Sequence, residues 1–274
     1  MFQKKNYIVV GLTTFHTEFL RISVPPLAKL PQNIFLIVHN DNPNASVTKS
    51  DIRKLGYRGP LHVINVERNG GPLQARLNIL AAIPKLRIQS DWMIFANDDD
   101  LLVDTEIPIV KDSNFAVMQN MVFIKKRILD LLKVMDNPKN YIIDNFHITM
   151  ERPHIGIVGT LLRTDMMIQV GKLIQPIMPN ILVIDSTLGT RAPEDIVMWF
   201  YLQMYAKQLN PDAEPIYMDK TNYIAVTLDF SPQKYGQNLI PDDQPTEYYD
   251  KSMQRYRDLF QEQLMDLAAT KVAR

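Results

Sequence analysis

The chain has 274 residues, of which 46% are hydrophobic and 22% are charged, as in a soluble globular protein of one large domain or two small ones. Its 30 basic and 30 acidic residues balance, so no global field favours nucleic acid or an anionic membrane as a partner. Cysteine is absent, which excludes disulfides and cysteine-ligated zinc. No apolar stretch reaches the roughly 18 residues of a membrane span, and no signal-type region follows the polar start, so we expect a soluble, cytoplasmic protein.

The first hundred residues alternate between apolar runs of strand length and segments with helical periodicity. The four predicted strands are residues 7–12, 33–38, 61–66 and 92–96. The predicted helices between them are residues 19–30, 46–55 and a segment that begins at Pro72. We expect Pro25-Pro26 to break or restart the first of these helices. This alternation predicts an α/β fold with a parallel, doubly wound sheet.

The pattern is less regular in the second half of the chain. Residues 121–135 have helical periodicity with a basic side, which predicts an amphipathic surface helix. A further strand is predicted over 155–162 and a short helix over 165–170. A longer helix begins at the Pro193-Glu194-Asp195 segment and continues to about Leu209. A final amphipathic helix is predicted over 248–267.

Three adjacent carboxylates, Asp98-Asp99-Asp100, follow directly after the fourth predicted strand. Adjacent carboxylates repel one another unless they are solvated or share a cation. Open α/β sheets place their ligand sites at the carboxyl ends of the strands. Oxygen ligands suit Mg²⁺ or Mn²⁺, and phosphate oxygens complete the coordination shell. The triplet therefore predicts a divalent metal site for a phosphorylated ligand, and the alternative is a solvated turn.

Polar motifs also follow the other predicted strands. They are Thr14-Phe15-His16-Thr17 after the first strand, Asn40-Asp41 after the second, Asn69-Gly70-Gly71 with Ala75-Arg76-Leu77-Asn78 after the third, and Glu194-Asp195 at the late helix. In this order, over residues 7–205, they resemble the nucleotide-diphospho-sugar glycosyltransferases of the GT-A fold, especially the large family-two type. The chain departs from that family at His16-Thr17, where the family has Asn and Arg, and at Leu77, where it has Asn.

The resemblance implies a GT-A fold, which is a Rossmann-like, mostly parallel sheet flanked by helices, with a C-terminal helix, in a single domain of residues 1–274. Within it, residues 1–102 would form the nucleotide-binding half, and residues 103–274 the acceptor half and C-terminal helix. The implied reaction moves a sugar from a nucleotide-diphosphate donor, above all a UDP-sugar, to a hydroxyl of a carbohydrate acceptor. The implied cofactor is Mn²⁺ or Mg²⁺.

The resemblance also implies roles for individual residues. The metal would be bound by Asp98, Asp99 and Asp100. We expect the pair Asp98 and Asp100 to provide one direct ligand, and the alternative frame is Asn97 with Asp99. The nucleotide-binding residues would be Thr13, Thr14, Asn40, Asp41, Arg76, Asp98 and Asp99. A plain turn is the alternative for Asn40 and Asp41, and a surface arginine for Arg76.

The catalytic residues implied by the resemblance are Asp195 and Glu194, with Asp195 as the general base. Inverting transfer needs a carboxylate within hydrogen-bond reach of the attacking hydroxyl. The alternative for Asp195 is an acid that only complements the dipole at the start of its helix.

Three other functions stay open on the sequence. The run from Glu194 to Met198 and the triplet followed by Leu101 are also similar to the exostosin group, whose enzymes retain the stereochemistry of the donor. A sugar nucleotidyltransferase would carry a glycine-rich loop with a basic residue after its first strand, and Gly11 to Phe15 lacks one. A non-catalytic binding protein is the third alternative, against which the acid triplet argues, because unused clustered carboxylates repel without benefit.

Overall fold

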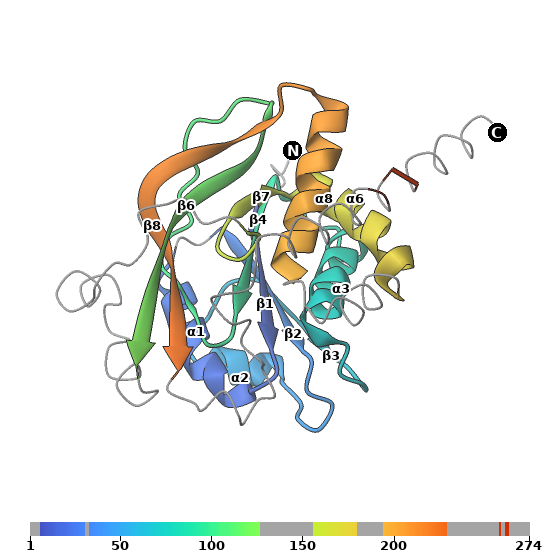
Figure 1. Ribbon diagram of the computed structural model, residues 1–274. Helices are drawn as coiled ribbons and strands as arrows, with labels where there is room; N and C mark the ends of the chain where they lie inside the picture. The colour runs from blue at the N-terminus through green and yellow to red at the C-terminus, as the bar shows by residue number, and fades with distance from the viewer. Residues whose placement is uncertain are drawn as a thin grey trace, which may run out of the picture.

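The computed structural model describes residues 6–30, 33–126, 156–179 and 194–228, together with Asp258, Gln261 and Glu262. These residues form one curled sheet of eight strands in the order β3-β2-β1-β4-β7-β6-β8-β5, flanked by helices (Figure 1). The predicted α/β fold with a mostly parallel sheet is therefore confirmed. The predicted C-terminal helix over 248–267 lies outside the described residues, except for the three named above, which are helical. Within this described part, no helix combines the length and the apolar character that a membrane crossing requires.

The four strands predicted in the first hundred residues form the parallel half of the sheet. They are β1 (Ile8–Thr14), β2 (Ile34–Asn40), β3 (Leu61–Asn65) and β4 (Trp92–Asn97). Strand β1 lies between β2 and β4, with Thr14 opposite Asn40 and Thr13 opposite Asn97. The carboxyl ends of these strands therefore meet at one edge of the sheet, where open α/β folds bind their ligands.

Three helices connect these strands, and a short 3-10 helix, η1 (Thr17–Phe19), precedes the first of them. They are α1 (Leu20–Ala28), α2 (Lys49–Lys54) and α3 (Gly71–Lys85). The expectation that Pro25-Pro26 would break the first helix is wrong, because α1 continues through both prolines. The two prolines remove two backbone donors, and the helix ends two residues after Pro26. The buried side chains of Val24 and Leu27 hold the segment against the core.

The second half of the chain extends the same sheet. Strand β7 (Leu161–Arg163) pairs antiparallel with β4 and with β6 (Asn114–Lys126). Strand β8 (Glu214–Leu228) then pairs parallel with β6, and the short β5 (Leu101–Leu102) pairs antiparallel with β8. Together β6 and β8 form the long curved pair of strands seen on one side of Figure 1. Neither β5 nor β8 is predicted by the sequence patterns.

The predicted helix over 121–135 is wrong over residues 121–126, which belong to β6, and its remainder lies outside the described residues. Pairing with β8 continues through this stretch, from Met121 opposite Tyr223 to Lys126 opposite Leu228. A strand distant in sequence thus supplies backbone partners that local periodicity cannot anticipate.

The predicted strand over 155–162 is also too long. Val158 makes only an isolated bridge with Phe95, and regular pairing begins at Leu161. Between them, Gly159 adopts a positive φ of 73°, a left-handed conformation that interrupts an extended strand.

Three further elements complete the described helices: α6 (Thr164–Ile174), η2 (Gln175–Ile177) and α8 (Glu194–Leu209). The predicted helix over 165–170 is confirmed but ends later, because α6 continues through Gly171. A Cβ at this glycine would lie 2.9 Å from the Leu80 Cδ1 atom, so its absence lets α6 pack closely against α3. The predicted late helix is confirmed, and α8 begins at Glu194.

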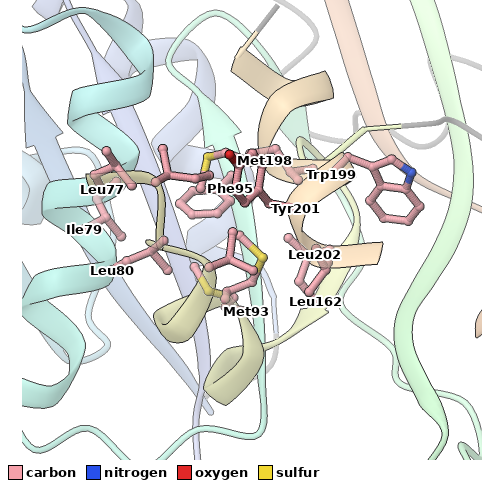
Figure 2. Close-up of a cluster of buried hydrophobic side chains, with 14 of the residues drawn as sticks. Leu77, Ile79, Leu80, Met93, Phe95, Leu162, Met198, Trp199, Tyr201 and Leu202 are labelled. Atoms are coloured by element: carbon pink, nitrogen blue, oxygen red, sulfur yellow. The ribbon is translucent and has the colours of Figure 1, made fainter. Parts of the chain in front are cut away.

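Helix α8 runs antiparallel to β4. Both contribute to one cluster of buried hydrophobic side chains, between the sheet and helices α3, α6 and α8. Figure 2 draws Met198 and Phe95 at one level of this cluster, and Leu202, Leu162 and Met93 at the next. As α8 advances from Met198 to Leu202, β4 therefore runs back from Phe95 to Met93. The first turn of α8 consequently faces the carboxyl end of β4.

Candidate active site

Asp98 follows β4 and is enclosed by the turn that follows β1. Its Oδ2 atom accepts hydrogen bonds from the Thr14 hydroxyl at 2.6 Å and from the backbone N–H groups of Phe15 at 3.2 Å and His16 at 3.3 Å. Burial, reinforced by the charge of Asp99, raises the pKa of Asp98 to about 7, although these hydrogen bonds act in the opposite direction. The carboxyl therefore lies in a site where a negative charge is unfavourable unless another group compensates for it.

Asp99 and Asp100 have different surroundings. Asp99 is half-buried, and its burial raises the pKa of its carboxyl, against an opposing effect of His16. Asp100 is buried, and its Oδ2 atom accepts hydrogen bonds from the Asn97 side-chain amide at 3.0 Å and from the Tyr223 hydroxyl at 2.9 Å. The two outer acids of the triplet are thus each anchored through one oxygen.

The donor chemistry of this triplet fits a divalent cation. Among the residues that the structure describes, no group of three His, Asp or Glu side chains is arranged to hold a metal ion by itself. Mg²⁺ is usually bound through one or two carboxylates, with substrate phosphates and waters completing its shell. Hard carboxylate oxygens, and the raised pKa values of Asp98 and Asp99, are consistent with such a shared site.

Arg76 is not a surface residue of α3, because only 1% of it is exposed. Its Nη2 atom donates to the Asn97 side-chain oxygen at 3.3 Å, and its guanidinium carbon lies 5.9 Å from the centre of the Phe95 ring. Arg76 is therefore connected to Asp100 through the amide of Asn97. A direct contact between Arg76 and a nucleotide stays a prediction.

The residues that follow β2 organise the same edge of the sheet. Asp41 accepts from the backbone N–H groups of Gly70 at 3.0 Å and Gly71 at 2.8 Å, which joins the end of β2 to the start of α3. The buried Asn40 amide donates to the Ala45 carbonyl at 2.6 Å and to the Asn65 side chain at 3.0 Å. Both residues therefore have structural roles, and their contact with a nucleotide stays a prediction.

Two aromatic side chains border the acid triplet. Phe15 is 41% exposed, and its ring lies 5.1 Å from that of His16. The His16 ring in turn lies 5.2 Å from that of Phe19. Thr13, which was also predicted to bind the nucleotide, lies near the end of β1, and its hydroxyl donates to the Ala96 carbonyl at 3.5 Å. Phe15 has no predicted role from the sequence, where its only signal is a place between two strand-end polar residues.

The structure also adds Tyr223, which no sequence motif identified. It lies in β8, more than a hundred residues after the acid triplet, and no local pattern predicted that strand. Its only signal in the sequence is its place in the short apolar run over residues 223–226.

Glu194 and Asp195 begin α8, as predicted. Their side chains lie outside the described part of the structure. Because α8 runs antiparallel to β4, the first turn of the helix lies toward the carboxyl end of β4. The general-base role of Asp195 stays a prediction.

Comparisons with known proteins identify the fold. No protein-family model and no curated protein sequence matches the chain. Among solved structures, GalNAc-T7 with UDP, GalNAc and Mn²⁺ aligns with a TM-score of 0.52 and 13% identity, over 93% of this chain and 50% of that one. TarS 1–349 of S. aureus aligns with a TM-score of 0.47 and 14% identity, over 93% of this chain and 71% of that one. The mannosyltransferase PcManGT of Pyrobaculum calidifontis, with GDP-Man and Mn²⁺, aligns with a TM-score of 0.42 and 10% identity, over 97% of this chain and 76% of that one.

The similarity to GalNAc-T7 shows that this chain has the GT-A fold of nucleotide-sugar glycosyltransferases. The chain corresponds to half the length of that protein.

Proposed function

We propose that this chain is a glycosyltransferase that moves a sugar from a nucleotide-diphosphate donor to an acceptor hydroxyl and uses a divalent cation. The observation that carries the proposal is the acid triplet Asp98–Asp100 at the carboxyl edge of a GT-A sheet, where two of the three acids are buried and anchored. GalNAc-T7, which shares this fold, was crystallised with UDP, GalNAc and Mn²⁺. Clustered carboxylates that bind no cation repel one another without benefit, so the intact triplet argues against a protein that has lost this chemistry.

Asp98 and Asp100 are the candidate residues for holding Mn²⁺ or Mg²⁺, together with oxygens of the diphosphate. When bound, the cation stabilises the negative charge that develops on the diphosphate as the glycosidic bond breaks. The Oδ2 atom of Asp98 already accepts three hydrogen bonds from the turn after β1. We infer that one of the two acids binds the cation directly and that the other orients the loop. Asp99, which is only half-buried, is the candidate for contact with the nucleotide.

The nucleotide would lie over the ends of β1 and β2, near Thr13, Thr14, Asn40 and Asp41. The exposed ring of Phe15 offers a stacking surface for a base at this place. Stacking of a base on an aromatic side chain contributes about 1–3 kcal/mol. We propose a UDP-sugar as the donor, a nucleotide-binding half over 1–102, and an acceptor half over 103–274 that receives a carbohydrate.

Asp195, with Glu194 beside it, is the proposed catalytic base. The proposal is supported by the orientation of α8, whose first turn lies toward the carboxyl end of β4, and by the helix amino terminus, which favours an ionised carboxylate. An ionised Asp195 would accept the proton of the acceptor hydroxyl as that oxygen attacks the sugar, and the product would be inverted. The alternative, which the similarity of the Glu194–Met198 run to exostosins supports, is a transferase that retains the stereochemistry.

A donor panel tests the proposal. UDP-sugars and GDP-sugars are incubated with the protein in Mn²⁺ or in EDTA, and the release of nucleoside diphosphate is measured with and without a carbohydrate acceptor. We expect release from one UDP-sugar in Mn²⁺ only, and its loss in Asp100→Ala. Asp112→Ala, which removes an exposed acid next to the amino end of β6, is the matched control and should behave as wild type. Binding of UDP without any turnover of the panel would instead favour the non-catalytic alternative.

A further inference from the structure

Tyr223 of β8 joins the two ends of the loop that contains the acid triplet. Its side chain is fully buried, and its hydroxyl accepts a hydrogen bond from the backbone N–H of Asn97 at 3.0 Å. The same hydroxyl donates to the Asp100 Oδ2 atom at 2.9 Å. One side chain from the second half of the chain therefore bridges the last residue of β4 and the last acid of the triplet.

The ring of Tyr223 is held in place by its neighbours. A Cβ atom at Gly159 would lie 2.7 Å from the Tyr223 Cγ atom, so only a glycine allows this approach. Gly159 is itself fixed, because its N–H donates to the Phe95 carbonyl at 2.9 Å and its carbonyl accepts from the Asn222 side-chain amide. The Asn222 carbonyl accepts from the Val103 N–H at 2.8 Å, on the other side of the triplet. These contacts fix the position of the hydroxyl relative to the acid loop.

Asp100 is also restrained by a second donor. The Asn97 side-chain amide donates to the same Oδ2 atom at 3.0 Å, and its oxygen accepts from Arg76 at 3.3 Å. Two donors that converge on one carboxylate oxygen fix the rotation of the whole carboxylate, and so the direction in which its other oxygen lies. Groups that orient a metal-binding side chain in this way set how well it binds the metal.

We infer that Tyr223 is a positioning residue whose hydroxyl orients Asp100 for binding of the divalent cation. The inference rests on the proposed function for its cation. It also means that β8, in the proposed acceptor half, completes the metal site of the nucleotide-binding half.

The test compares Tyr223→Phe with Tyr57→Phe. Both variants remove a buried hydroxyl that donates a hydrogen bond, but Tyr57 donates to the Ile34 carbonyl at 2.9 Å, at the amino end of β2 and away from the triplet. For each protein, Mn²⁺ is titrated at a fixed concentration of UDP and binding is followed by calorimetry. A UDP titration in EDTA reports the nucleotide affinity without the metal.

Loss of a group that orients a metal ligand typically weakens metal binding about 10–100-fold. We therefore expect Tyr223→Phe to raise the half-saturating Mn²⁺ concentration about tenfold or more, with UDP binding in EDTA unchanged. Tyr57→Phe should leave both quantities at the wild-type values. If the hydroxyl only stabilises the fold, the two variants will lower the melting temperature and neither will change the Mn²⁺ titration.

The outcomes separate this inference from the proposed function. If the wild-type protein binds Mn²⁺ with UDP and Tyr223→Phe gives the same Mn²⁺ titration, the inference is overturned and the proposed function stands. If Tyr223→Phe binds Mn²⁺ more weakly but the wild-type protein turns over no donor, the inference is supported and the transferase activity is overturned. If wild-type protein binds UDP equally in Mn²⁺ and EDTA, the metal site and the role of Tyr223 are both overturned.

Discussion

Replacement of Asp98 by Asn measures how much the buried, ionised carboxylate of Asp98 lowers the free energy of unfolding. Asp98 is 9% exposed, and burial together with the charge of Asp99 raises the pKa of its carboxyl to about 7 from an ordinary value of 3.8. An asparagine keeps the shape and an oxygen that can accept from Thr14, but it carries no charge. A pKa raised by about three units corresponds to an upper limit of about 4 kcal/mol against the ionised, folded state.

The sign of the pH dependence follows from proton binding. Because the folded protein binds this proton more tightly than the unfolded chain does, stability falls as the pH rises from about 4 to about 7. Above about pH 7 the penalty is complete, and below about pH 4 it is absent. In metal-free buffer with EDTA, we expect D98N to be more stable than wild type by about 2–4 kcal/mol at pH 8 and to match it near pH 4.

Urea unfolding of both proteins at pH 4, 6 and 8 checks this expectation, with D112N as the control for loss of an exposed acid. D112N should follow wild type at every pH. A D98N protein that is less stable than wild type at pH 8, or whose difference from wild type does not change with pH, would refute the reasoning. It would mean that the hydrogen bonds to the carboxylate outweigh its burial.

Three further predictions address the site. In wild type, UDP should raise the melting temperature more in Mn²⁺ than in EDTA, whereas in Asp100→Ala the two rises should be equal. A larger rise in Mn²⁺ for the variant would exclude Asp100 as a metal ligand. Asp195→Asn should keep UDP binding but lower the transfer rate about 10²–10⁴-fold, and near-native transfer would leave Asp195 as a helix-end acid only. Asp41→Ala should lower the free energy of unfolding by about 1–3 kcal/mol, because the N–H groups of Gly70 and Gly71 lose this carboxylate as an acceptor. A urea midpoint equal to that of wild type would contradict this.

The parallel half of the fold was predictable because its determinants are local. Each strand from β1 to β4 is a short apolar run that ends in turn-forming residues, and each is separated from the next by a segment with helical periodicity. The position of Asp98–Asp100 at a strand end follows from the same pattern. The start of α8 at Glu194 was also predictable, since a proline and two acids mark the beginning of a helix.

Only the tertiary structure decided which residues surround the acids. Arg76 lies on a helix whose pattern also allowed a surface position. It is buried because α3 packs against β1 and β2, with its guanidinium over the ring of Phe95 in β4. Tyr223 reaches Asp100 because β8 pairs with β5 and β6, which lie about a hundred residues or more before it along the chain. Pairing between strands this distant depends on the whole sheet rather than on a local repeat, which is why residues 121–126 were predicted as a helix and β8 was not predicted at all.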